Sequence, residues 1–249
     1  ESGAYSKIVY LPCTPRNGFI PEPPKRRVDL IYLCSPNNPT GATVTKSDLK
    51  NFVEFCLDNG LILCYDNAYS EVTCGGYRAP SVLEVNGAME IAVEVHSCSK
   101  TFNMTGDRIG FAVGNSEIIE GLVKVKSQVD SGPSKYVQRA AVAGLSAYKS
   151  SEQPRCLKEI NRTYWRRAKV LVGGLKSLGF ECDLPKATFY LWVGCGGSSL
   201  EFVKKMLQVN VVATPGVGFG SNGEGYIRFA LTCSEERIKE ACERLKEIF

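Results

Sequence analysis

The sequence predicts an α/β fold, with a mostly parallel sheet followed by a smaller α+β unit. Three short apolar runs, residues 30–34, 61–64 and 91–95, have the length and composition of buried strands rather than helices. A cluster of polar residues follows each run. Helical patterns separate the runs, and this alternation is typical of a parallel sheet. Because open α/β sheets bind ligands at the carboxyl ends of their strands, the three polar clusters indicate one shared site.

The helix after the first run has the clearest pattern. Its apolar residues recur at i, i+3, i+4, i+7 and i+8, which places them on one helix face. They are Leu49, Phe52, Val53, Cys56 and Leu57. Thr45 stands at the N-cap position with Asp48 three residues later, so we predict a capping box. Gly60 is placed to end the helix.

The rest of the chain predicts further helices and a second, smaller unit. The expected elements are helices over 116–129, 136–148 and 152–178, a strand at 189–193, a helix near 200–207, a strand at 226–231, and a last helix capped by Ser234. We therefore divide the chain into residues 1–150, the C-terminal part of a large ligand-binding domain, and residues 151–249, a small C-terminal domain.

Composition is that of an ordinary globular protein. Of 249 residues, 44% are hydrophobic and 22% charged, and the formal net charge is only +4. The basic residues are scattered, so nucleic-acid binding is not supported. No apolar run approaches the roughly 18 residues of a membrane span, and we expect no membrane partner. We expect a cytoplasmic location, with an organelle as the alternative.

The cysteine and histidine content argues against a metal site. The eleven cysteines include no C-x-x-C pair, and several lie within apolar runs as small buried hydrophobes in a reducing compartment do. We therefore expect no metal. His96 is the one histidine, and at a strand end we expect it to pack; a Ser-His-Asp triad is the alternative.

One glycine pattern has two interpretations. Residues 218–223 satisfy the G-x-G-x-x-G fingerprint of dinucleotide sites. That fingerprint needs a helix after it, whereas the segment that follows here, residues 226–231, has strand composition. We expect a flexible loop near the substrate.

The run from Ser97 to Arg108 is the most informative chemical feature. A lysine at a strand end, here Lys100, can form a Schiff base with an aldehyde cofactor. Ser97, Ser99 and Arg108 supply the hydroxyl and guanidinium donors that a bound phosphate needs. Together these residues indicate a binding site for pyridoxal phosphate (PLP).

The motifs taken together resemble a known family. Asn-Pro-Thr-Gly at 38–41, Asp-x-x-Tyr at 66–69, Ser-x-x-Lys at 97–100 and the strand arginine Arg228 resemble class I/II aminotransferases, which are fold-type I PLP-dependent enzymes. The resemblance covers essentially the whole chain. More narrowly, residues 99–115 and 214–232 resemble bacterial-type LL-diaminopimelate aminotransferases.

The resemblance implies roles for the residues nearest the cofactor ring. Lys100 would hold PLP and move a proton as general base and then acid. Asp66 would pair with the pyridine nitrogen, which keeps the ring an electron sink. Asn38 and Tyr69 would donate to the phenolic oxygen of the cofactor. The alternatives are a turn or cap role for Asp66, a turn role for Asn38 and a core role for Tyr69.

The remaining implied contacts are to phosphate and substrate. Ser97, Ser99 and Arg108 would hold the phosphate. Arg228, on an otherwise apolar strand, would grip the substrate α-carboxylate together with Asn38; a salt bridge is the alternative for Arg228.

The function implied is transfer of an amino group between an L-amino acid and a 2-oxo acid, with LL-diaminopimelate and 2-oxoglutarate, in lysine biosynthesis, as the specific expectation. The alternatives are an aspartate- or alanine-type aminotransferase, a PLP β-lyase or decarboxylase, and a truncated non-catalytic fragment. That last alternative arises because residues 1–19 already resemble the middle of the large domain, so the family's N-terminal segment is expected to be missing. A homodimer is expected for the full-length form.

Overall fold

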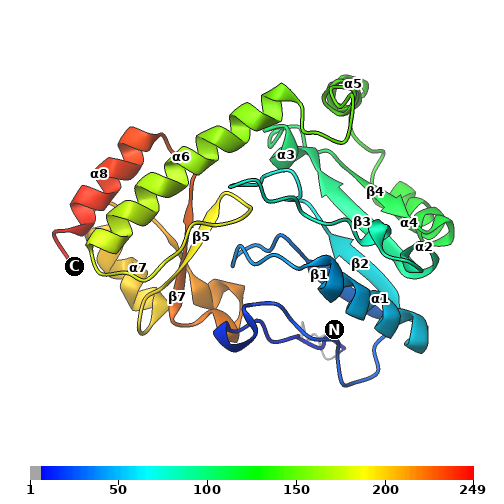
Figure 1. The fold of residues 1–249 in the computed structure, drawn as a ribbon, viewed down its shortest axis with the longest axis horizontal. Coiled ribbons are helices and arrows are strands. Elements are labelled where there is room, and N and C mark those ends of the chain that lie inside the picture. Colours follow the sequence, from blue (N-terminus) through cyan, green and yellow to red (C-terminus); the bar gives the residue numbers. More distant parts are fainter. Residues whose placement is uncertain (1–6) are drawn as a thin grey trace.

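A computed structural model describes residues 7–249. Residues 1–6, which begin the segment 1–19 discussed above, lie outside the described residues. The described part contains two sheets (Figure 1). The strands are β1 (Leu30–Cys34), β2 (Ile62–Asp66), β3 (Ala92–Ser97), β4 (Gly110–Gly114), β5 (Tyr190–Gly194), β6 (Thr214–Pro215) and β7 (Tyr226–Ala230). The helices are α1 (Lys46–Asn59), α2 (Ala88–Ile91), α3 (Cys98–Thr101), α4 (Ser116–Val129), α5 (Lys135–Leu145), α6 (Arg155–Ser177), α7 (Ser199–Gln208) and α8 (Glu235–Leu245).

The first sheet has the order β1-β2-β3-β4. β1, β2 and β3 are parallel, and β4 pairs antiparallel with β3. This confirms the predicted mostly parallel α/β sheet. The carboxyl ends of the three parallel strands lie side by side, so the polar segments that follow them meet at one edge of the sheet.

Helix α1 covers one face of this sheet and begins as predicted. The Thr45 hydroxyl accepts the backbone N–H of Asp48, and the Asp48 carboxylate accepts the backbone N–H of Thr45 at 2.7 Å. Gly60 ends the helix in the left-handed conformation, with φ of 63°. The buried face of α1 packs on Ile31, Leu33, Leu63 and Tyr65 in one core.

Strands β1 and β2 are buried on one face rather than both, whereas Ala92, Val93 and Glu94 of β3 are all buried. Ile31 and Leu33 are buried, whereas Leu30 and Tyr32, on the opposite face of β1, are 50% and 59% exposed. The expectation of fully buried strands was therefore wrong for β1 and β2. The physical reason is that α1 covers only the face on which Ile31 and Leu33 lie.

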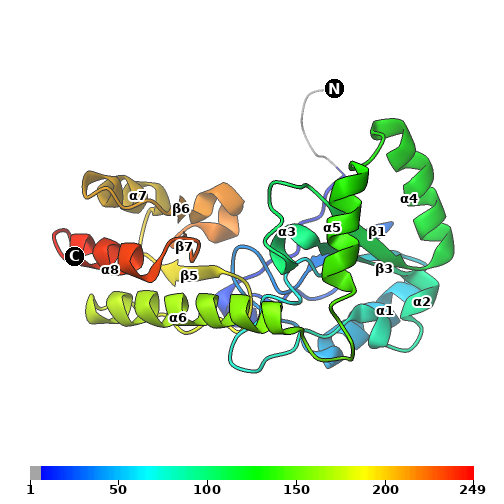
Figure 2. The same ribbon diagram turned by 90° about the horizontal axis from the view of Figure 1, so that it is seen from above.

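The second sheet is antiparallel and has the order β5-β7-β6. Helices α6 and α8 pack on it to form a second core, and α6 runs from this sheet toward α3 and α5 (Figures 1 and 2). Helix α6 begins at residue 155 rather than 152, because Pro154 is its N-cap residue. Predicted helix 136–148 likewise ends at residue 145.

The two cores share a segment. Tyr69 and Val72, which follow β2, belong to the second core. Residues 72–74 also pair with 186–188 through backbone hydrogen bonds, among them Cys74 N–H to Lys186 O at 2.8 Å. The proposed division near residue 150 falls between α5 and α6, and it stays a prediction.

Within residues 7–249 no helix is both long and apolar enough to cross a membrane.

Candidate active site

Lys100 lies in the one-turn helix α3, directly after β3. Its ammonium nitrogen is 5.8 Å from the centroid of the Tyr69 ring and 5.8 Å from that of the Phe189 ring. These two rings meet edge to face at 5.6 Å. Lys100 therefore extends from the first sheet toward aromatic side chains of the second core.

Tyr69 connects this lysine to Arg228. The Tyr69 and Tyr190 rings meet edge to face at 6.0 Å, and burial, followed by the neighbouring Tyr190 hydroxyl, raises the pKa of the Tyr69 phenol. The Arg228 guanidinium in turn lies 4.1 Å from the Tyr190 ring centroid and 4.7 Å from that of Phe219. The Tyr69 hydroxyl is thus kept neutral and available as a donor.

Arg228 and Asn38 lie in direct contact. The guanidinium donates to Asn38 Oδ1 at 2.7 Å and to the Thr214 hydroxyl at 3.3 Å. Its Nε is buried and has no hydrogen-bond partner among residues 7–249. These two bonds use two of the five N–H donors of the guanidinium, so its planar fork can also bind a carboxylate. The alternative of a salt bridge for Arg228 has no support within the described chain, since the contacts above are to neutral groups.

Asp66 ends β2 and has a partner that the sequence did not indicate. The Tyr32 hydroxyl donates to Asp66 Oδ2 at 2.6 Å, and the Ala68 backbone N–H donates to Oδ1 at 3.1 Å. Burial, then the hydrogen bond and charge of Asp66, raise the pKa of Tyr32. Tyr32 also lines a cavity of about 960 Å³ along β1, together with Cys34 and Ser35.

Ser99 and Arg108 form a separate pair beside Lys100. Ser99 is buried, and its hydroxyl accepts a hydrogen bond from the Arg108 guanidinium at 3.3 Å. The guanidinium also donates to the Thr105 carbonyl at 3.3 Å. Arg108 has a positive φ of 50°, which turns the chain back toward β3. A hydroxyl and a guanidinium that lie side by side can both donate hydrogen bonds to the oxygens of a phosphate.

Of the predicted site residues, three pairs are in contact: Asn38 with Arg228, Lys100 with Tyr69, and Ser99 with Arg108. Ser97 lies at the junction of β3 and α3, and within the described chain its side chain makes no cap bond to α3. Asp66 contacts Tyr32 and the turn backbone instead of the other predicted residues.

The sequence interpretation missed Tyr32, Tyr190 and Phe189. Tyr32 lies on the same face as Asp66, one step diagonally across the β1–β2 register, because Cys34 pairs with Asp66. Period-2 alternation of β1 could have indicated this face. Tyr190 and Phe189 come from the second sheet, and no local pattern links them to Lys100.

Two other predictions concern residues near the site. His96 donates from Nε2 to the Glu94 carboxylate at 2.8 Å and stacks on Phe111, which agrees with a packing role and not with a triad on Ser97. The glycine pattern at 218–223 forms two 3₁₀ turns and is followed by β7, not by a helix. No group of three potential metal ligands occurs among the described residues.

The fold and this arrangement define a PLP-dependent aminotransferase architecture. The family model for aminotransferase class I and II matches residues 19–245, and the chain belongs to this family. Members of the family are PLP-dependent.

Similar proteins carry narrower names. The chain is 43% identical to LL-diaminopimelate aminotransferase from Syntrophobacter fumaroxidans, over 98% of the chain and 64% of that protein. It is 46% identical to LL-diaminopimelate aminotransferase 2 from Trichormus variabilis, over 92% of the chain and 58% of that protein. The solved structure of L,L-diaminopimelate aminotransferase from Chlamydomonas reinhardtii matches with a TM-score of 0.82 at 36% identity, over 96% of the chain and 60% of that structure. The chain therefore spans less than two thirds of the length of these relatives.

Proposed function

We propose that this chain carries the lysine-bearing core of a PLP-dependent aminotransferase, which moves an amino group between an L-amino acid and a 2-oxo acid. The observation that carries the proposal is one continuous set of contacts. It runs from Lys100 through Tyr69 and Tyr190 to Arg228 and Asn38, so the amine and the carboxylate-binding arginine belong to one cluster.

The donor set suits PLP. When bound, PLP supplies an aldehyde and an electron-withdrawing pyridine ring. The Asp66 carboxylate would face the ring nitrogen, with Tyr32 holding it in orientation. Ser99 and Arg108, assisted by Ser97, would bind the phosphate. Tyr69 and Asn38 would donate to the phenolic oxygen.

Lys100 is the group suited to move a proton. Its amine would remove a proton from the substrate α-carbon and return one on the cofactor side, as general base and then acid. Arg228 would hold the substrate α-carboxylate through the terminal nitrogens of its guanidinium, beside Asn38, so the α-carbon is presented to the amine. Phe189 and Tyr69 would limit the positions that the Lys100 amine can occupy.

The specific substrate pair that we propose is LL-diaminopimelate with 2-oxoglutarate. The support is the name shared by relatives that are 43% and 46% identical to this chain. A homodimer is proposed for the longer protein, because dimerisation is typical of the family. An aspartate- or alanine-type aminotransferase and a PLP β-lyase use similar cofactor contacts, and they remain the alternatives to be tested.

Absorption spectroscopy tests cofactor binding by this chain. PLP titration should produce a protein-bound visible band that borohydride reduction abolishes. Lys100→Ala should lack the band, whereas the control Lys124→Ala, which removes an exposed lysine paired with Glu120, should keep it. A folded chain without the band would contradict cofactor binding by these 249 residues.

Turnover tests the reaction class and must use a longer protein that contains this chain. An aminotransferase should consume LL-diaminopimelate only when a 2-oxo acid is present. A lyase would release ammonia and pyruvate without that partner. Brisk turnover of aspartate or alanine and none of diaminopimelate would contradict the proposed substrate.

A further inference from the structure

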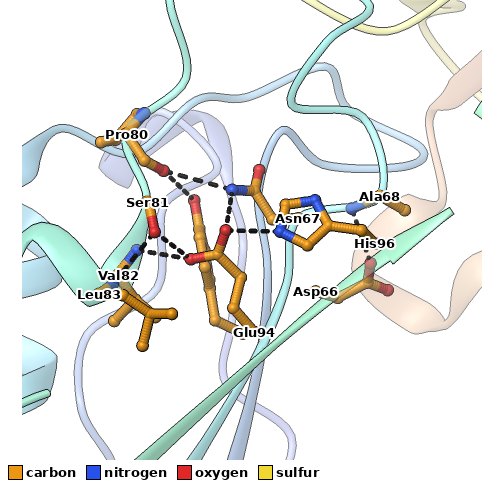
Figure 3. A network of polar contacts seen from close by, with 10 residues as sticks. Asp66, Asn67, Ala68, Pro80, Ser81, Val82, Leu83, Glu94 and His96 are labelled. Atoms are coloured by element: carbon orange, nitrogen blue, oxygen red, sulfur yellow. Dashed lines mark hydrogen bonds and ion pairs between the residues drawn. The ribbon is translucent and has the colours of Figure 1, made fainter. Parts of the chain in front are cut away.

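Glu94 is a buried carboxylate that the proposed chemistry does not use. It lies in β3 and is 2% exposed. Its Oε1 accepts hydrogen bonds from His96 Nε2 at 2.8 Å and Asn67 Nδ2 at 2.9 Å. Its Oε2 accepts from the Ser81 hydroxyl at 2.6 Å and the Val82 backbone N–H at 2.8 Å (Figure 3). Both oxygens are therefore satisfied.

Four donors change what burial does to this group. Burial alone raises a carboxylate pKa, but the hydrogen bonds from His96, Ser81 and Asn67 together lower the pKa of Glu94 below its ordinary value. Hydrogen bonds to an ionised group are stronger than those between neutral groups, so the charged Glu94 carboxylate holds its four donors in place.

Glu94 lies behind the proposed cofactor contacts. In the β2–β3 register Glu94 pairs with Tyr65, and Val95 pairs with Asp66. Side chains alternate between the two faces of a strand, so Glu94 and Asp66 point to opposite faces of the sheet. Glu94 can act on the site only through the residues that it holds.

Two of those residues adjoin proposed cofactor contacts. Asn67 directly follows Asp66, and its backbone N–H donates to Val95 O at 3.0 Å. The Asn67 side-chain oxygen has no partner in the described part of the chain, so Glu94 is its main side-chain anchor. His96 directly precedes Ser97 and is clamped between Glu94 and the Phe111 ring, 4.8 Å away.

We propose that Glu94 is a positioning residue for two segments, the Asp66 turn (residues 66–68), which it holds through Asn67, and the Ser97 turn (residues 97–99), which it holds through His96. By holding both segments, Glu94 sets the distance between the residues that contact the cofactor ring and those that contact its phosphate. The inference rests on the proposed function for the identity of those two contacts. One carboxylate on β3 thereby couples the ends of two neighbouring strands.

The other hydrogen bonds to Glu94 provide a matched control for this proposal. The bonds of Glu94 to Ser81 and Val82 hold the start of the 3₁₀ turn at Val82–Glu84. This segment contacts Asn67 through a hydrogen bond from Asn67 Nδ2 to Pro80 O at 3.4 Å, which Ser81→Ala leaves in place. Ser81→Ala removes one hydrogen bond from Glu94, as Asn67→Ala and His96→Phe do, and His96→Phe retains a ring for Phe111 to stack on. Each of the three variants therefore removes one hydrogen bond to Glu94, and they differ mainly in which segment loses it.

The loss of these restraints can be measured as faster amide hydrogen exchange in the full chain without cofactor. Glu94→Gln should accelerate exchange in residues 66–68 and in 97–99 by about tenfold or more, the effect expected from losing a bond to a charged group. Asn67→Ala should accelerate only the first segment, and His96→Phe only the second. Ser81→Ala should leave both unchanged and accelerate exchange near residues 82–85.

Affinities for PLP and for pyridoxal, which lacks the phosphate, add an independent measure. His96→Phe should weaken PLP binding but not pyridoxal binding, because it loosens only the phosphate end. Asn67→Ala should weaken both by the same factor.

Three outcomes are decisive. If Ser81→Ala accelerates 66–68 and 97–99 as much as the other variants do at equal loss of stability, Glu94 serves stability alone and the proposal is overturned. Unchanged exchange in Glu94→Gln also overturns it. If the parent chain binds neither PLP nor pyridoxal, the proposed function fails for this chain, while the exchange result still decides whether Glu94 holds the two turns.

Discussion

The Tyr32 hydroxyl lies 2.6 Å from Asp66 Oδ2 and donates a hydrogen bond to it. The two residues lie on adjacent parallel strands, on the face of the sheet opposite α1. Asp66 is therefore held from two sides, by a side-chain hydroxyl and by the Ala68 backbone N–H.

Tyr32→Phe should weaken PLP binding by about three- to tenfold, because it removes one hydrogen bond that orients a charged group while keeping the ring. A PLP titration followed by absorption measures this. The control is Tyr136→Phe in α5, on an exposed side chain that lies outside the cavity along β1. Equal effects in the two variants would show that the Tyr32–Asp66 bond has no role in cofactor binding.

Arg228→Lys should weaken 2-oxoglutarate binding by about tenfold or more, since lysine supplies a point charge where arginine supplies a planar fork. PLP affinity should fall by a smaller factor than 2-oxoglutarate affinity, because Arg228 reaches the proposed cofactor contacts through Asn38 and does not touch the Ser99–Arg108 pair. Calorimetry with each ligand separates the two effects. Parallel losses for both ligands would contradict a substrate role.

The lowered pKa of Glu94 predicts how the free energy of unfolding changes with pH in acid. Its folded-state pKa is lowered, so its contribution is complete above the ordinary glutamate pKa of about 4.3 and is lost as pH falls through the folded value. Between about pH 5 and 3, Glu94→Gln should therefore lose free energy of unfolding less steeply than the parent chain. Urea denaturation at each pH measures the slope.

Glu152→Gln is the control for this acid dependence. The Glu152 pKa is also lowered, by Lys158 at 2.9 Å, but the pair is on the surface. Added salt should remove the effect of Glu152→Gln and leave that of Glu94→Gln, because only the exposed pair is screened. Identical slopes for Glu94→Gln and the parent would contradict the assigned pKa direction.

Two adjacent glycines of α6 should respond oppositely to alanine. A Cβ on Gly173 would meet nothing within 4 Å, so Gly173→Ala should stabilise the chain by about 0.8–1 kcal/mol through helix propensity. A Cβ on Gly174 would lie 2.3 Å from Cys242 Sγ in α8, so Gly174→Ala should destabilise by about 1–3 kcal/mol through overpacking. Denaturant unfolding measures both, and the same sign in both variants would contradict the α6–α8 packing.

The fold was largely predictable because its signals are local. The Thr45–Asp48 capping box, the helical spacing in α1 and the short apolar runs each depend on a few neighbouring residues, and the structure confirms them. The exposure of Leu30 and Tyr32 was not predictable, because it depends on which face of the sheet α1 covers.

The site was predicted as a list of residues but not as a set of contacts. Lys100, Arg108 and Asn38 stand in recognisable motifs, whereas Tyr190 reaches Tyr69 only through packing of the second sheet on the first. Glu94 was overlooked because it lies within an apolar run. A single carboxylate in such a run needs several donors when buried, and that requirement is a signal that sequence reasoning can use.

The Asn38–Arg228 hydrogen bond joins residues that are 190 positions apart. Closing a loop of that length costs chain entropy that no local contact repays, so the contact can persist only after both sheets have formed. The Ser99–Arg108 pair, nine positions apart, closes a short loop at far smaller cost. We therefore expect the turn after β3 to form before the junction between the sheets. Binding of a carboxylate ligand at that junction would consequently report that both sheets, and not one of them, have reached their native topology.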